Sequence, residues 1–122
     1  MTDTTARPDL RTQLDELHAL LAQGQFLEAM DRFLADDVVL QEGNDPPKQG
    51  KAAVMDFEAK VLEGVASFGG YRVSSSAVAG DKTFYEAVME YTQTDGETVR
   101  VEQCVVDTWK DGRIVHERFY HA

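Results

Sequence analysis

The sequence predicts an α+β fold, in which three helices from the first half pack on an antiparallel sheet built from the second half. Apolar residues recur at helical spacing up to about residue 65, and afterwards they alternate as in strands. Three turn signals divide the second half, at Gly80-Asp81, Asp95-Gly96 and Asp111-Gly112. Helices followed by strands are typical of a fold in which the helices cover one face of the sheet.

The helices are predicted from stripes of apolar residues. The first stripe is Leu10, Leu14, Leu17 and Leu21, closed by Gly24, and the second lies in GQFLEAMDRFLADD and comprises Phe26, Met30, Phe33 and Leu34. A strand, VVLQE, and a proline-containing loop, EGNDPPKQG, separate these from a third helix that begins at Lys51. The stripe of the third helix is Val54, Phe57, Val61 and Val65.

Length and charge limit the kind of protein. The 122 residues suffice for one core, so we expect a single domain over residues 1–122, with residues 1–8 as a loose polar tail. The net charge of −10 disfavours binding to nucleic acid or to anionic membranes. No apolar run approaches the length of a membrane span, and the start, MTDTTARPDLRTQ, lacks the apolar core of a signal peptide. We therefore expect a cytoplasmic protein.

The turn signals predict which side chains share a face of the sheet. A two-residue turn at Asp95-Gly96 and a three-residue turn at 110–112 place one set of residues together, which includes Phe84, Glu86, Gln103, Val105, Asp107, Glu117 and Phe119. This mixture of acids, amide and apolar residues suits a ligand pocket beneath the helices. The opposite face, with Tyr85, Met89, Tyr91, Ile114 and Tyr120, suits the interface of a homodimer. A slip of one residue in either turn would exchange the two faces.

Two acids on the predicted pocket face are candidates for catalysis. Glu86 and Glu117 fall in one cross-strand row on either side of Val105, which puts their Cα atoms roughly 10 Å apart. Burial and mutual repulsion would raise the pKa of one carboxyl towards neutrality, as general acid–base chemistry requires. The alternative is that one of the two acids lies at the rim or pairs with an arginine such as Arg32.

Further residues are candidates for substrate binding. Glu42 lies where the first strand meets the proline loop, either as a base or as a solvated loop acid, and Gln103 can orient a carbonyl or can be a satisfied buried amide. Phe57, Phe84 and Phe119 are expected to line the pocket or to fill it. The three His residues and the single Cys show no spacing for a metal site, so we expect neither metal nor cofactor.

Several segments resemble the nuclear transport factor 2-like superfamily, and within it the SnoaL-like polyketide cyclase group. These segments are FLADDVV at the end of the second helix, QEGNDPPKQGKAAV, and the closing WKDGRIVHERFYHA. The resemblance covers roughly residues 10–121 and implies a cone: a curved antiparallel sheet wrapped around three helices, with an internal pocket and usually a homodimer. Members include isomerases, cyclases, epoxide hydrolases and binding modules, so the resemblance implies a fold more strongly than a reaction.

The catalytic positions of known members differ here. Where ketosteroid isomerase-like members carry an Asp, a Tyr and a second Asp, this chain has Gln41-Glu42, Leu17 and Gln103 or Cys104. Where epoxide hydrolase-like members carry an Arg and two Asp, it has Glu86, Val88 and Phe119. Two hypotheses remain. One is a cofactor-free acid–base enzyme acting on a small, largely apolar molecule, and the other is a non-catalytic ligand-binding or dimerisation module.

Overall fold

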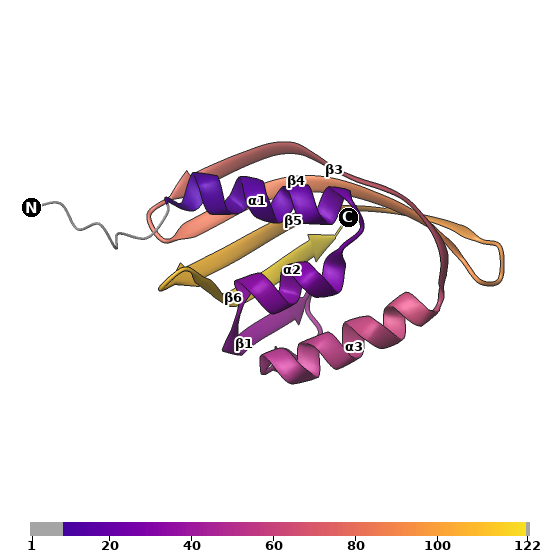
Figure 1. The fold of residues 1–122 in the computed structure, drawn as a ribbon, viewed down its shortest axis with the longest axis horizontal. Helices are drawn as coiled ribbons and strands as arrows, with labels where there is room; N and C mark the ends of the chain where they lie inside the picture. Colours follow the sequence, from indigo (N-terminus) through magenta and orange to yellow (C-terminus); the bar gives the residue numbers. More distant parts are fainter. Residues whose placement is uncertain (1–8, 122) are drawn as a thin grey trace, which may run out of the picture.

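The computed structural model describes residues 9–121, and the predicted tail at residues 1–8 lies outside them. Three helices, α1 (Leu10–Ala22), α2 (Phe26–Phe33) and α3 (Lys51–Glu63), lie on one face of a curved sheet (Figure 1). The strands are β1 (Leu34–Glu42), β2 (Lys48–Gln49), β3 (Val65–Ala79), β4 (Lys82–Gln93), β5 (Thr98–Lys110) and β6 (Arg113–His121). The predicted α+β cone is confirmed.

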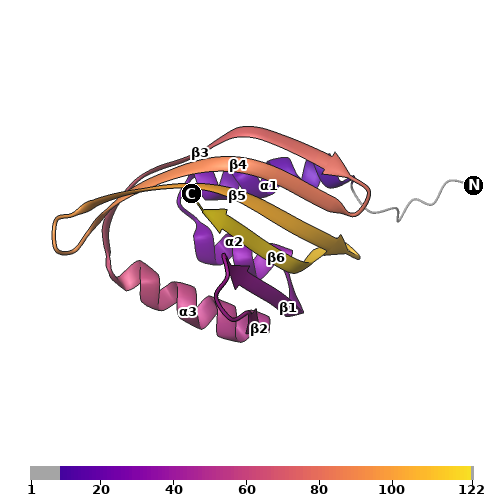
Figure 2. The same ribbon diagram turned by 180° about the vertical axis from the view of Figure 1, so that it is seen from behind.

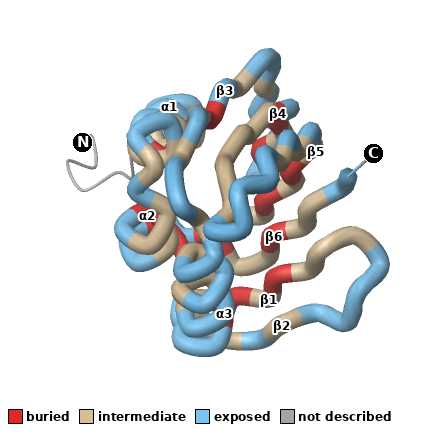
Figure 3. Tube along the Cα trace, turned by 90° about the vertical axis from the view of Figure 1, so that its right-hand side faces the viewer, coloured by how far each residue is buried: buried red, intermediate tan, exposed pale blue. Residues whose placement is uncertain are grey.

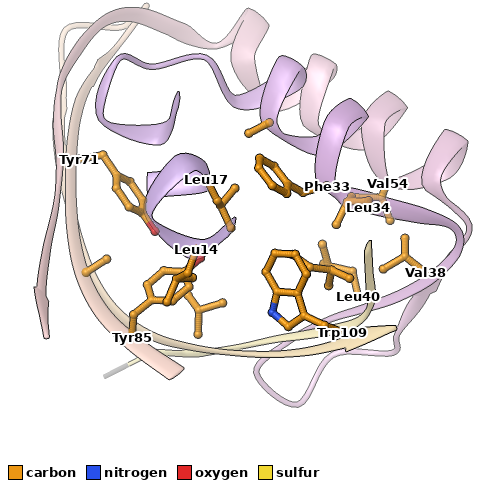
Figure 4. Packing of buried hydrophobic residues seen from close by; sticks show 14 residues of the cluster. Leu14, Leu17, Phe33, Leu34, Val38, Leu40, Val54, Tyr71, Tyr85 and Trp109 are labelled. Carbon is orange, nitrogen blue, oxygen red and sulfur yellow. The ribbon is translucent and has the colours of Figure 1, made fainter. Parts of the chain in front are cut away.

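The apolar stripes of the first two helices form the core as predicted. The Asp9 side chain accepts a hydrogen bond from the Thr12 amide at 2.8 Å and so caps α1. Leu14 and Leu17 of α1 are buried against the sheet, and so is Phe33 of α2 (Figure 4). The ring of Phe33 meets Trp109 of β5 edge-on, with ring centroids 6.0 Å apart.

The third helix is rotated relative to its predicted face. Val54 is buried, but Phe57 and Val61 are 45% and 42% exposed. The helix turns Val54 and Glu58 towards the interior instead, since residues four apart lie on one helical face. The prediction that Phe57 faces the pocket is therefore wrong, and the Lys48 ammonium lies 4.0 Å from the centre of its ring instead.

The sheet order is β2-β1-β6-β5-β4-β3, and the predicted meander of four antiparallel strands is β3 to β6. The prediction of a wholly antiparallel sheet is wrong at one place, because β1 runs parallel to β6. The chain leaves β1, makes α3 and the meander, and returns beside β1 with its last strand. Figure 3 shows the three helices gathered on one side of the sheet, and Figure 2 shows the opposite face without a helix.

Pairing within the meander differs from the predicted register. The β4–β5 loop has three residues rather than two, because the Gln93 amide donates to the Glu97 carbonyl at 2.8 Å. Ala87 consequently faces Gln103, and Tyr85 faces Val105, one residue from the predicted pairs.

The β5–β6 turn is the two-residue Asp111-Gly112, with both residues at positive φ. A further register shift between Thr108 and Trp109 brings the displacement to two residues beyond that point, so Glu117 and Phe119 keep their predicted face, whereas Ile114, which lies before the shift, lines the cavity.

A close backbone approach accompanies the bending of β3. Its pairing with β4 shifts register between Phe68 and Gly70, as at a β-bulge. A Cβ atom on Gly69 would lie 3.0 Å from the Glu90 carbonyl oxygen, so the two strands meet closely only because this residue is glycine.

Among the described residues, no helix has the length and apolar character needed to span a membrane.

Candidate functional site

A cavity of about 130 Å³ lies between the helices and the concave face of the sheet. Apolar side chains from α1 and α2 form one wall, among them Leu17, Phe26 and Phe33. Five polar side chains converge on it from four strands and the third helix: Glu42, Glu58, Tyr71, Gln103 and Glu117. An apolar cavity with a few convergent polar groups is the usual form of a small-molecule site.

Two buried carboxyls face each other at this cavity. Glu117 on β6 lines it with 7% of its surface exposed, and Asp107, its cross-strand neighbour on β5, is completely buried. Neither oxygen of Asp107 has a hydrogen bond of normal geometry with a described residue. The pair is nonetheless close enough for a hydrogen bond between the carboxyls to influence the pKa of each.

Burial governs the protonation of this pair. Loss of water raises the pKa of Asp107 well above its ordinary value, and the charge of Glu117 raises it further. Burial also raises the pKa of Glu117, while the contact with Asp107 opposes that shift and the charge of Glu42 adds to it. Two like charges this close are costly, so the pair favours holding one proton between two carboxyls.

Two tyrosines extend the polar side of the cavity. The hydroxyls of Tyr71 on β3 and Tyr85 on β4 point towards each other beneath α1 (Figure 4). Burial raises the pKa of Tyr71 to about 12, although hydrogen bonds with Gln103 and Tyr85 lower it in part. Tyr71 is therefore a neutral hydrogen-bond donor at physiological pH.

Two further acids lie on the side nearer to solvent. Glu42 lines both the cavity and a neighbouring surface hollow, and its Oε1 atom is 2.9 Å from Nε2 of His121. Burial raises the pKa of Glu58, and the charges of Glu42 and Glu117 raise it further. The cavity is thus acidic from its interior to its opening.

The structure brings together four of the seven residues predicted for the site. Glu42, Gln103, Glu117 and Phe119 line the cavity. Glu86 does not, and the prediction that it faces the cavity beside Glu117 is wrong. It is exposed on the outer face of the sheet, where Ser75 donates to its Oε1 atom at 2.8 Å. Phe84 shares that outer face, because the three-residue loop turns all of β4 over.

The residues predicted for the interface lie partly on the inner face. Tyr85 and Met89 line the cavity because β4 is turned over, and Ile114 of β6 lines it because the β5–β6 pairing shifts register between Thr108 and Trp109. Of the aromatic residues assigned to the outer face, Tyr120 lies there and is 45% exposed.

Sequence reasoning missed Asp107, Tyr71, Tyr85 and Glu58 as parts of the site. The alternation in β4 held a usable signal. Its Tyr85, Ala87 and Met89 face is more apolar than its Glu86, Val88 and Glu90 face, and the more apolar face turns inward. Asp107 was predicted to lie on the same face of the sheet as Gln103 and Glu117, but its pairing with Glu117 depends on the length of the β5–β6 turn.

The described residues contain no group of three or more His, Cys, Asp or Glu side chains placed to hold a metal ion. What the arrangement offers is proton transfer at a carboxyl pair, together with hydrogen-bond donation from a phenol and an amide.

Known proteins share this fold across nearly the whole chain. A SnoaL-like protein from Mesorhizobium loti, described as a polyketide cyclase, is 26% identical, with a TM-score of 0.81 over 93% of this chain and 99% of that one. A protein from Bacillus subtilis described as an isomerase is 18% identical (TM-score 0.75, 92% of this chain and 85% of that one).

A third protein, from Catenulispora acidiphila, has a ketosteroid isomerase-like fold and was crystallised in complex with trimethylamine. It is 13% identical, with a TM-score of 0.74 over 90% of this chain and 85% of that one. No curated protein sequence matches the chain significantly. The sequence model of the SnoaL-like domain matches residues 14–117. The chain therefore belongs to the SnoaL-like domain family.

Proposed function

We propose that this protein is a cofactor-free acid–base enzyme that acts on a small, largely apolar molecule in the cavity. The observation that carries the proposal is the carboxyl of Glu117, which lines the cavity with Asp107 directly behind it. The reaction is of the isomerase, cyclase or hydrolase type, since each of these needs a proton moved by a group whose pKa is brought towards neutrality.

Each polar residue has a distinct role in this proposal. Glu117 takes a proton from a carbon or oxygen of the substrate and returns it to another atom, while Asp107 stays protonated and donates a hydrogen bond to Glu117. Tyr71 and Gln103 donate hydrogen bonds to the substrate oxygen on which negative charge develops. The raised pKa of Tyr71 keeps its hydroxyl available as a donor. Glu42 orients the substrate near the opening, with His121 as its partner.

Proton transfer can be tested before the natural substrate is known. Small ketones with acidic C–H bonds are incubated with the protein in D₂O, and exchange of hydrogen for deuterium is followed by NMR. We expect wild type to accelerate exchange for ketones that fit the cavity, and Glu117→Gln to lose about 10²–10⁴-fold of that rate while remaining folded. Glu86→Gln, on the exposed outer face, is the matched control and should keep the rate. Equal rates in wild type and Glu117→Gln would contradict the role of Glu117.

The second candidate function is ligand binding without catalysis. The largely apolar wall of the cavity favours it, because Leu17, Phe26 and Phe33 can hold a ligand by burial alone. The trimethylamine complex of the Catenulispora protein supports the ligand-binding part, since it is a protein of this fold with a small organic molecule bound. Ketones that bind without exchanging hydrogen in either wild type or Glu117→Gln would favour this second function.

A homodimer through the outer face of the sheet is also proposed. No helix among the described residues covers this face, and half-buried apolar side chains such as Val88, Cys104 and Val106 lie there beside the exposed ring of Tyr120. A face with this many apolar groups suits contact with a second copy of the chain.

A further inference from the structure

We propose that the cavity binds an organic cation: a compact apolar body that carries a protonated amine or a quaternary ammonium. This inference rests on the cavity being the ligand site of the proposed function, and it adds the charge class of the ligand.

The charge of the cavity wall favours a cationic ligand. Three carboxyl side chains line the cavity, Glu42, Glu58 and Glu117, and none of the described residues that line it is Lys, Arg or His. His121 contacts Glu42, but no described cation forms an ion pair with Glu58 or Glu117. These carboxyls would repel an anionic ligand and attract a cationic one.

Burial of the two carboxyls without a cation also favours this ligand class. Asp107 is fully buried with no hydrogen bond of normal geometry to a described residue, and Glu117 is 7% exposed. Buried polar groups almost always have a partner, and a buried acid without one is costly. A cation next to Glu117 would supply the opposite charge that the described protein residues do not.

The aromatic rings of the cavity wall also favour a cationic ligand. Phe26, Phe33 and Phe119 line the cavity together with Tyr71 and Tyr85. The rings of Phe26 and Tyr71 lie at a steep angle, 69° between their planes with centroids 6.2 Å apart. Aromatic faces attract cations, most of all where water is excluded, and sets of such rings recognise ammonium groups.

The volume limits the body of the ligand. The cavity measures about 130 Å³, close to the roughly 150 Å³ of a cavity that encloses benzene. A single six-membered ring bearing one ammonium group therefore matches both the size and the charge of the site.

Three compounds of nearly equal shape test this inference: benzylammonium, benzyl alcohol and benzoate, titrated into wild type at pH 7 by calorimetry. We expect benzylammonium to bind at least tenfold more tightly than benzyl alcohol, and benzoate to bind most weakly. Equal or tighter binding of benzyl alcohol or benzoate would overturn the inference while leaving the proposed function in place. Absence of binding by all three would overturn the inference as well, and the ketone exchange experiment would then decide the proposed function separately.

Charge-neutralising variants locate the attraction. Glu58→Gln and Glu117→Gln should each weaken benzylammonium binding about tenfold or more and leave benzyl alcohol binding within about twofold. Glu63→Gln, on the exposed side of the same helix as Glu58, removes one charge outside the cavity and is the matched control. If Glu63→Gln weakens benzylammonium as much as Glu58→Gln does, the preference comes from overall charge and the assignment to the cavity is wrong.

Discussion

Asp107 is the residue that links the candidate site to the stability of the fold. Its carboxyl is buried without a hydrogen bond of normal geometry, and burial together with Glu117 raises its pKa well above 3.8. The folded protein therefore binds this proton more tightly than the unfolded chain does. The free energy of unfolding consequently falls as the pH rises from about 4 towards the raised pKa, because keeping the proton becomes more costly.

We expect Asp107→Asn to remove this dependence. The Asn side chain does not titrate in this pH range, so folding no longer has to keep a proton on this group. The variant should be more stable than wild type by about 1–3 kcal/mol at pH 8, and the difference should shrink towards pH 4. Urea unfolding at several pH values measures it. Burial lowers the pKa of His18 to about 4, so the stability linked to this residue is lost as the pH falls from 6.5. His18 is present in both proteins, so its contribution cancels in the difference. A difference that stays constant between pH 4 and pH 8 would contradict the raised pKa of Asp107.

The sequence placed some residues of the candidate site on the correct face of the sheet, but not their cross-strand partners. Glu117 and Gln103 were found because alternation along a strand is fixed by the backbone. Asp107 was placed on the correct face, but its partner was missed because a pairing register depends on turn geometry rather than on the strands themselves.

Elements were predicted more securely than the contacts between them. The apolar stripes of α1 and α2 face the core as expected, with Leu14, Leu17 and Phe33 buried and the other members partly buried against them. The face of α3 was predicted wrongly, because apolar residues occur all along this helix. Val54 and Leu62 are more buried than Phe57 and Val61. β4 was turned over for a different reason: a loop longer by one residue exchanges its faces, and Asp95-Gly96 occurs in loops of two or three residues.

The close contact of β3 with β4 gives a prediction about the sheet. We expect Gly69→Ala to destabilise the protein by about 1–3 kcal/mol, because the new Cβ would lie 3.0 Å from the Glu90 carbonyl oxygen. Gly64→Ala, at the end of α3, is the matched control. Its Cβ would meet an ordinary contact at 3.5 Å, so its stability should stay within about 1 kcal/mol of wild type. Thermal unfolding compares the two variants, and a Gly69→Ala protein as stable as Gly64→Ala would show that the approach is not tight.

At the scale of the whole molecule, the uncovered face of the sheet predicts a dimer. Light scattering at micromolar concentration should give twice the mass of one chain. Tyr120→Asp should shift the protein towards the monomer, because it puts a charge on the exposed apolar group of that face. A wild-type monomer under these conditions would contradict the proposed interface and leave the cavity unaffected.

The net charge of −10 also has a different meaning once the acids are located. Many acidic side chains on the helices are exposed, such as Asp15, Glu16 and Asp56, and the first two form surface ion pairs with arginines. A smaller set is enclosed with the cavity, from Glu42 and Glu58 to the pair of Asp107 and Glu117. Only this smaller part of the acidic excess bears on the proposed function.

The shared proton at Asp107 and Glu117 is the central claim, and a carbon-13 NMR titration of the side-chain carboxyls measures it without a substrate. We expect one carboxyl carbon of the pair to titrate well above the ordinary range for Asp and Glu. We also expect Glu117→Gln to lower the pKa of Asp107, because one charge that raises it is gone. Two carboxyls that both titrate near their ordinary values of 3.8 and 4.5 would contradict this claim.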